Sequence, residues 1–164
     1  MLLPRIKSGD TTNVEARAAI IYWKLLFGEN FVRDRYGSVP NAHLNYIYAI
    51  LRATVARALV SSGLLPTFGI FHSNKYNAYA LADDIMEPYR PFADLMIYEM
   101  MQNGIIYDED ITLEHKREIL SFETMDVWIN KKKGPLMVAI SRSTSSLEEC
   151  FEGKRRKIVY PDLL

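Results

Sequence analysis

Residues 40–63, PNAHLNYIYAILRATVARALVSSG, decide the fold class of this 164-residue chain. Apolar residues recur in this stretch at intervals of three and four, which places them on one face of a helix: Leu44, Ile47, Tyr48, Leu51, Val55, Ala58 and Leu59. The helix should open near Pro40 and Asn41 and stop at residues 61–63, Ser-Ser-Gly. The stretch therefore predicts a long helix with one apolar face.

A second helix is expected immediately before this one, over residues 12–27. Thr12 and Glu15 have the spacing of a capping box, in which each side chain binds a backbone N–H of the first turn. The residues from Ala16 to Phe27 favour helix, and Gly28 suits its end.

Beyond the central helix, residues 64–72 contain a proline and a glycine among apolar residues and are expected to form a buried loop. A third helix should begin between Asn74 and Ala78 and continue to Met101. Pro88 and Pro91 remove helix hydrogen bonds, so a kink or break is expected around Glu87.

The last third of the chain also reads mostly as helix. After a loop over residues 103–110, Thr112 can cap a short helix through Leu120. Residues 122–129 are ambiguous, and residues 131–134 form a basic turn before a final helix from Pro135 to Phe151. The expected fold class is all-α, with one helical domain over residues 1–164.

Composition supports one folded domain in the cytoplasm. Hydrophobic residues make up 49% of the chain and charged residues 24%, which argues against disorder. No apolar stretch approaches the length of a membrane span, and the first five residues lack the order of charges found in a secretory signal. Cys150 is the single cysteine, so no disulfide forms within the chain.

Charge is balanced overall and unevenly distributed. Residues 77–112 carry eight acids against one base, whereas residues 1–62 and 131–164 each carry eight bases against four acids. Any affinity for nucleic acid must therefore come from a local basic surface. The clusters at residues 131–133 and 154–157 are expected to be solvated tips with incidental affinity for DNA.

The acidic residues Asp83, Asp84 and Glu87 form the most informative cluster. Their spacing on a helix places the carboxylates on one face, where like charges repel. One interpretation is an exposed acidic surface. The other is a cation site, because the neighbouring residues are apolar and a bound divalent ion would relieve the repulsion.

The remaining candidates each have a structural alternative. His72 follows an apolar loop and could be either a buried hydrogen-bonded residue or a metal ligand, and Glu15 could simply close the capping box. His43 and His115 read as helix surface residues. No Glu-x-x-His pair, Walker loop or Gly-x-Ser-x-Gly is present, which argues against a di-iron bundle, a P-loop enzyme and a serine hydrolase.

Four blocks in order resemble one family. Residues 9–19 (GDTTNVEARAA), 41–49 (NAHLNYIYA), 63–72 (GLLPTFGIFH) and 81–91 (LADDIMEPYRP) are similar to the CRISPR-associated adaptation integrase and endonuclease family, Cas one, in its type II branch. Residues 135–161 also resemble the end of that family. The resemblance covers nearly all of the chain after Lys7.

This resemblance implies that the chain is the C-terminal helical catalytic lobe. Members of the family begin with a β-rich domain that precedes the glutamate block and builds the homodimer, and nothing in this sequence corresponds to it. Dimerisation is therefore doubtful for this chain. Ala16 also differs from the glycine that is common after the glutamate.

The resemblance further implies that Glu15, His72 and Glu87 bind a divalent metal, with Asp84 as a nearby acidic catalytic partner. A histidine beside carboxylates suits Mn²⁺ or Mg²⁺, and Mn²⁺ is expected to bind more tightly. The implied reaction is phosphodiester transesterification, in which the 3′ hydroxyl of captured DNA attacks a phosphate at the edge of a repeat.

DNA is the implied partner, as the prespacer and as the CRISPR repeat. Lys75 is the first choice for a phosphate contact, and Arg90 is the second, although Arg90 could instead pair with Asp94 one turn later. The family works with the small second adaptation protein, Cas two, and in type II systems with Cas nine. The alternative function is a folded but inactive truncated remnant or interaction module.

Overall fold

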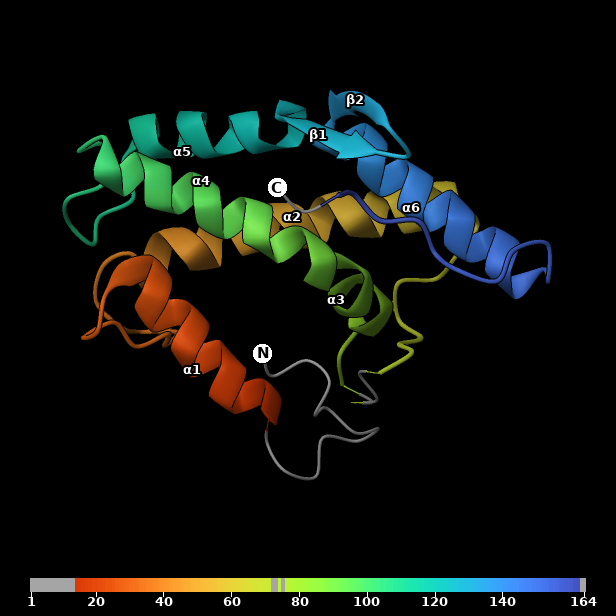
Figure 1. Ribbon diagram of the computed structural model, residues 1–164, viewed down its shortest axis with the longest axis horizontal. Coiled ribbons are helices and arrows are strands. Elements are labelled where there is room, and N and C mark those ends of the chain that lie inside the picture. Colours follow the sequence, from red (N-terminus) through yellow and green to blue (C-terminus); the bar gives the residue numbers. More distant parts are fainter. Residues whose placement is uncertain (1–13, 72–73, 75, 163–164) are drawn as a thin grey trace.

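Helix α2 (Asn41–Ser61) is the central element of the fold, as its apolar spacing predicts. The structure is a computed structural model that describes residues 14–71, 74 and 76–162. The predicted face of α2 is buried, with Leu44, Ile47 and Leu51 fully enclosed. Figure 1 shows α2 passing behind α4, with α6 beside one end of it.

Seven further helical segments and one hairpin complete the described fold. The helix over the predicted 12–27 segment is described from Val14, so its capping box at Thr12 lies outside the described residues. In chain order the other elements are α1 (Val14–Phe27), α3 (Ala80–Met86), the 3₁₀ turn η2 (Glu87–Tyr89), α4 (Arg90–Gln102), α5 (Leu113–Leu120), the 3₁₀ turn η3 (Ser121–Thr124), β1 (Asp126–Ile129), β2 (Lys132–Pro135) and α6 (Leu136–Phe151).

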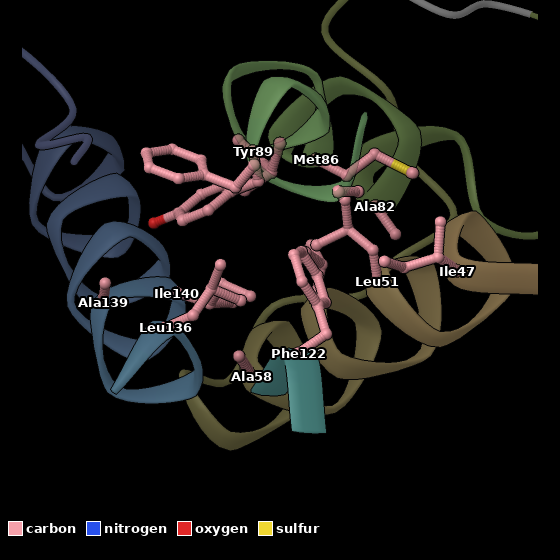
Figure 2. Close-up of a cluster of buried hydrophobic side chains, with 14 of the residues drawn as sticks. Ile47, Leu51, Ala58, Ala82, Met86, Tyr89, Phe122, Leu136, Ala139 and Ile140 are labelled. Carbon is pink, nitrogen blue, oxygen red and sulfur yellow. The ribbon is translucent and has the colours of Figure 1, made fainter. Parts of the chain in front are cut away.

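A single apolar cluster joins α2 to the later helices. Figure 2 shows Leu51 of α2, Phe122 of η3 and Tyr89 of η2 directed toward Leu136 and Ile140 of α6. These five side chains are fully buried. Burying an apolar side chain of this size stabilises a fold by about 1.5 to 3 kcal/mol, so this cluster fixes the positions of α3, η2 and α4 relative to α2.

The predicted break near Glu87 is present. The chain leaves α3 at Met86, passes through η2 and continues as α4 from Arg90. Pro88 and Pro91 lie in the first turn of η2 and of α4, where a missing N–H costs nothing because that group has no partner within the helix. This break places Glu87 and Arg90 at a junction between helices.

The expectation of an all-α fold is wrong in one region. Residues 126–135 form an antiparallel two-stranded hairpin, in which Ile129 pairs with Lys132 across a two-residue turn. Val127 and Ile129 are buried while their neighbours face solvent, the alternation of a strand. The fold is therefore mostly helical with one small sheet.

The two turn residues of the hairpin explain why it was missed. Asn130 and Lys131 have φ values of 52° and 61°, the left-handed backbone that a two-residue hairpin turn of this type requires at both positions. Asn-Gly is the usual signal for such a turn, and lysine carries none. Lys131 in the turn and the next two residues, Lys132 and Lys133, are exposed, as predicted.

The two histidines assigned to helix surfaces are buried, which corrects that prediction. Nε2 of His43 lies 3.0 Å from Nδ1 of His115, and the rings join α2 to the start of α5. Thr112 caps α5 as expected, since its hydroxyl accepts the backbone N–H of His115. Along the described part of the chain, no helix combines the length and hydropathy needed to cross a membrane.

Candidate functional site

The acidic cluster spans the end of α3 and the start of η2, and its three members differ in burial. Asp83 and Asp84 are 6% and 9% exposed, whereas about half of the Glu87 side chain is exposed. An idle solvated surface therefore does not describe the two aspartates. Buried carboxylates need hydrogen-bond or ionic partners, and both have them.

Asp83 serves to join helices. Its Oδ1 atom accepts a hydrogen bond of 2.7 Å from Nε of Arg52 on α2, and its Oδ2 atom accepts one of 2.7 Å from the side-chain amide of Asn77. This pair of contacts ties α3 to α2 and to the segment before α3. The repulsion expected from the spacing of the cluster is thus partly offset by the Arg52 cation.

Asp84 holds the loop that precedes His72. The prediction that this loop is buried is wrong for its described residues, since Phe68 and Phe71 are 72% and 86% exposed. The Oδ2 atom of Asp84 accepts the backbone N–H of Ile70 and that of Phe71, the latter at 2.9 Å. Two backbone N–H groups on one carboxylate fix the path of residues 70 and 71 over α3. His72 and Lys75, both predicted site residues, lie outside the described residues.

Glu87 begins η2, and its partner is the predicted DNA contact Arg90. Oε1 of Glu87 lies 3.0 Å from a terminal nitrogen of Arg90, three residues later. The alternative pairing of Arg90 with Asp94 is not the arrangement seen, because tyrosine hydroxyls occupy both oxygens of Asp94. Arg90 thus neutralises part of the charge on Glu87 and stays beside it.

Glu15 lies in the first turn of α1 and is exposed, while the adjacent Val14 is buried. The first turn of α1 and the loop before α3 lie on the same lower side of the molecule in Figure 1. Helix α1 is secured further along by Tyr22, which binds Asp94 of α4. Tyr48 of α2 binds the other oxygen of that carboxylate at 2.5 Å.

Asp94 is a buried residue that the sequence reasoning did not single out. Burial raises its pKa above the usual value, and the hydrogen bonds from Tyr48 and Tyr22 together with the charges of Arg90 and Arg33 oppose that shift. Burial and the charge of Asp94 raise the pKa of both tyrosines, which therefore stay protonated as donors. A lone acid within the otherwise apolar residues 92–98 was the available signal.

A three-ligand metal site remains a prediction. Within residues 14–71, 74 and 76–162, no group of three or more histidine, cysteine, aspartate or glutamate side chains is arranged to hold an ion. The predicted set includes His72, which is outside that range. Two carboxylates and one imidazole are donors that suit Mn²⁺ or Mg²⁺.

Comparison with known proteins places these features in a family. The profile described as "CRISPR associated protein Cas1" matches residues 7–132. The chain is 38% identical over 164 residues to the CRISPR-associated endonuclease Cas1 of Neisseria meningitidis serogroup C (strain 8013), covering 99% of this chain and 53% of the relative. It is 30% identical over 145 residues to CRISPR-associated endonuclease Cas1 2 of Pyrobaculum aerophilum, covering 87% of this chain and 48% of that protein.

A solved structure shares the fold. The chain named "Casposase bound to integration product" aligns with a TM-score of 0.78 at 22% sequence identity, over 93% of this chain and 52% of that one. This chain therefore spans about half the length of the relatives it matches. With a family profile over most of its length and a close relative aligned along nearly all of it, the chain belongs to the CRISPR associated protein Cas1 family.

Proposed function

We infer that this chain is the catalytic lobe of a metal-dependent DNA integrase and endonuclease that acts in CRISPR spacer acquisition. The observation that carries this proposal is the binding of residues 70 and 71 by Asp84, one helical turn before Glu87. This contact fixes residues 70 and 71, which come immediately before the predicted ligand His72 in the sequence. Membership of the Cas1 family, whose relatives carry the name endonuclease, supports the same chemistry.

Each proposed site residue has a separate task. Glu15, His72 and Glu87 would hold the divalent ion, which when bound supplies Lewis-acid polarisation of the scissile phosphate. Asp84 orients the loop as far as Phe71, the residue before His72 in the sequence. Arg90 keeps Glu87 in place through their ion pair and, together with Lys75, is proposed to contact DNA phosphates.

In the proposed reaction a 3′ hydroxyl of the prespacer attacks a phosphorus atom at the edge of the repeat. A new phosphodiester bond forms, and the original bond to the repeat strand breaks, which leaves that strand with a 3′ hydroxyl. With water as the nucleophile, the same geometry would cleave DNA. The proposed ion is Mn²⁺ or Mg²⁺, since the carboxylate oxygens accept either and the imidazole favours Mn²⁺.

Strand transfer in Mn²⁺ tests the proposal. A labelled DNA with a free 3′ hydroxyl is incubated with a repeat-containing plasmid, and the joined product is measured for the wild type, Glu15→Gln, His72→Ala and Glu87→Gln. Each variant should lose activity with an unchanged far-ultraviolet circular dichroism spectrum. Glu114→Gln, an exposed position at the start of α5, is the matched control and should retain activity. Full activity in all three site variants would remove the assignment.

The second candidate is a folded interaction module without catalysis. Calorimetric titration with Mn²⁺ and sedimentation distinguish the two. A monomer that binds Mn²⁺ but joins no DNA supports the module. In either case the proposed partners are DNA, the small protein Cas two and, in addition, Cas nine. The proposed compartment is the cytoplasm.

A further inference from the structure

The carboxylate of Asp94 joins three helices at one point. It belongs to α4 and is 2% exposed, and its two oxygens accept hydrogen bonds from Tyr22 of α1 and Tyr48 of α2. A bond between a hydroxyl and an ionised carboxylate is stronger than one between neutral groups, and it weakens steeply when its geometry is disturbed. Asp94 is therefore a fixed point between α1 and the central helix, and the proposed function gives it no task.

Helix α1 has few other contacts that could fix its position. Among the described residues of this helix only Val14 is buried, and Ile20 and Leu25 are more than half exposed. Its other printed contact with α4 is aromatic, since the Phe27 ring meets the Tyr98 ring edge-on with 6.3 Å between the centroids. Two apolar rings can slide further without loss than a hydrogen bond can, so the Tyr22 bond sets the position of α1 along its axis.

The two contacts show that α1 and α4 run in the same direction. Tyr22 meets Asp94, and Phe27, five residues later in α1, meets Tyr98, four residues later in α4. Figure 1 agrees, since both helices run from the middle of the molecule toward its left side. Contacts that advance together along two helices define a register, in which each position of one helix has a counterpart in the other.

Followed toward the N-terminus, this register reaches the two proposed glutamate ligands. Glu15 precedes Tyr22 by seven residues, and Glu87 precedes Asp94 by seven. Seven residues make about two helical turns, so Glu15 lies on the same face of α1 as Tyr22, about 10 Å away along the axis. The stretch from Glu87 to Asp94 covers a similar length, since η2 continues directly into α4. The pairing of Tyr22 with Asp94 thus aligns Glu15 with Glu87.

We propose that Asp94 is a positioning residue that sets the separation of Glu15 and Glu87 by fixing Tyr22. The inference rests on the proposed function, in which these two glutamates hold the divalent ion. Oxygen ligands bind Mg²⁺ at about 2.0 to 2.1 Å in near-ideal geometry, so a small slide of α1 takes one carboxylate out of reach. Asp94 and Tyr22 act on the ion only through the position of α1.

Tyr48 supplies a control on the same carboxylate. Tyr22→Phe and Tyr48→Phe each remove one hydroxyl donor from Asp94 and keep the aromatic ring. Tyr22 belongs to the helix that carries Glu15, whereas Tyr48 belongs to α2. A purely structural role for Asp94 gives both variants the same defect. A positioning role gives Tyr22→Phe a metal-binding defect that Tyr48→Phe does not share.

Calorimetric titration with Mn²⁺ tests the inference on the whole chain without DNA. Tyr22→Phe should bind Mn²⁺ about tenfold more weakly or worse, the range for groups that orient metal ligands, and Tyr48→Phe should bind it as tightly as the wild type. The titrations are repeated in sucrose, because an excluded osmolyte keeps a weakened variant folded. In strand transfer, Tyr22→Phe should need more Mn²⁺ for its half-maximal rate and regain the wild-type rate at saturating Mn²⁺.

Each contrary outcome has a separate meaning. If the wild type binds Mn²⁺ and Tyr22→Phe binds it equally well, the inference is overturned and the proposed function stands. An equal loss of affinity in Tyr22→Phe and Tyr48→Phe also overturns the inference, because it assigns Asp94 to stability alone. Absence of Mn²⁺ binding by the folded wild type rejects the proposed function, and the inference with it.

Discussion

The hydroxyl of Tyr22 donates a hydrogen bond of 2.7 Å to Oδ2 of Asp94, which lies 72 residues later in the chain. This bond connects α1, which carries Glu15, to the buried face of α4. Asp94 is 2% exposed, so the loss of one of its two tyrosine donors leaves an ionised carboxylate poorly satisfied.

Tyr22→Phe should therefore lower the free energy of unfolding by about 1.5 to 3 kcal/mol, the range for a hydrogen bond to a charged group. Urea denaturation measures this change. Tyr107→Phe is the control, because Tyr107 is 74% exposed, and its effect should stay within about 0.5 kcal/mol. Equal stabilities for the two variants would show that the Tyr22 bond contributes nothing.

Asp84 is predicted to act through the loop that it holds. Asp84→Ala removes the acceptor of the Ile70 and Phe71 amides, so their hydrogen exchange should accelerate by about tenfold or more, given about 1.5 to 3 kcal/mol for the lost contacts. Asp84→Asn keeps a carbonyl oxygen in the same place and should retain most of that protection.

Strand transfer by the two Asp84 variants separates positioning from chemistry. If Asp84 only positions the loop, Asp84→Asn retains activity and Asp84→Ala loses it. If both variants lose activity while Asp84→Asn keeps slow exchange, the carboxylate charge itself takes part in the reaction.

The buried pair of His43 and His115 predicts a pH dependence of stability. Burial and the charge of His115 lower the pKa of His43, with the carboxylate of Asp108 acting in the opposite direction. Below about pH 6.5, the unfolded chain binds a proton at His43 that the folded chain does not, so the free energy of unfolding falls as pH decreases through that window. Urea denaturation at pH 7.5 and 5.5 measures the change.

His43→Leu is the matched variant for this effect. The free energy of unfolding of this variant should fall less between pH 7.5 and 5.5 than that of the wild type, because the titrating group is gone while His72 and His115 remain. The same slope in both proteins would assign the pH dependence to other groups.

The hairpin turn offers a stabilising substitution. Lys131 has a φ of 61°, which costs a residue with a Cβ about 1 to 2 kcal/mol and costs glycine little. Glycine also loses more conformational entropy on folding than lysine does, which offsets part of this gain. Lys131→Gly should therefore raise the free energy of unfolding by about 0.5 to 1 kcal/mol. Lys132→Gly, in the strand beside it, should lower stability by a similar amount, and thermal denaturation of the two variants gives the comparison.

The local features of this fold were predictable and the long-range ones were not. The spacing of three and four residues between apolar positions in residues 41–61 was enough to predict α2. Two prolines were enough to predict the break at Glu87. The hairpin was missed because four alternating residues and an Asn-Lys turn give a weak signal. Position along a helix could not reveal that His43 meets His115, since that contact depends on how α5 packs.

The candidate site also has features that were predictable and features that were not. Carboxylate spacing and family resemblance singled out Asp84 and Glu87. Only the burial seen in the structure argued against the alternative, a solvated acidic surface. The binding of Ile70 by Asp84 joins residues 14 positions apart through a loop whose path no local pattern specifies. Arg33 had no sequence signal, because the Asn41 and Asn45 amides that hold it become neighbours only after α2 forms.

The sparse burial of α1 has a consequence for handling the protein. Within this helix Val14 is the buried residue, while Ile20 and Leu25 are 58% and 82% exposed. Segments with few buried apolar contacts open at lower free energy than the rest of a domain. A protease added to the folded protein should therefore cut first around residues 28–38, releasing the helix that carries Glu15 and leaving the part built on α2 intact.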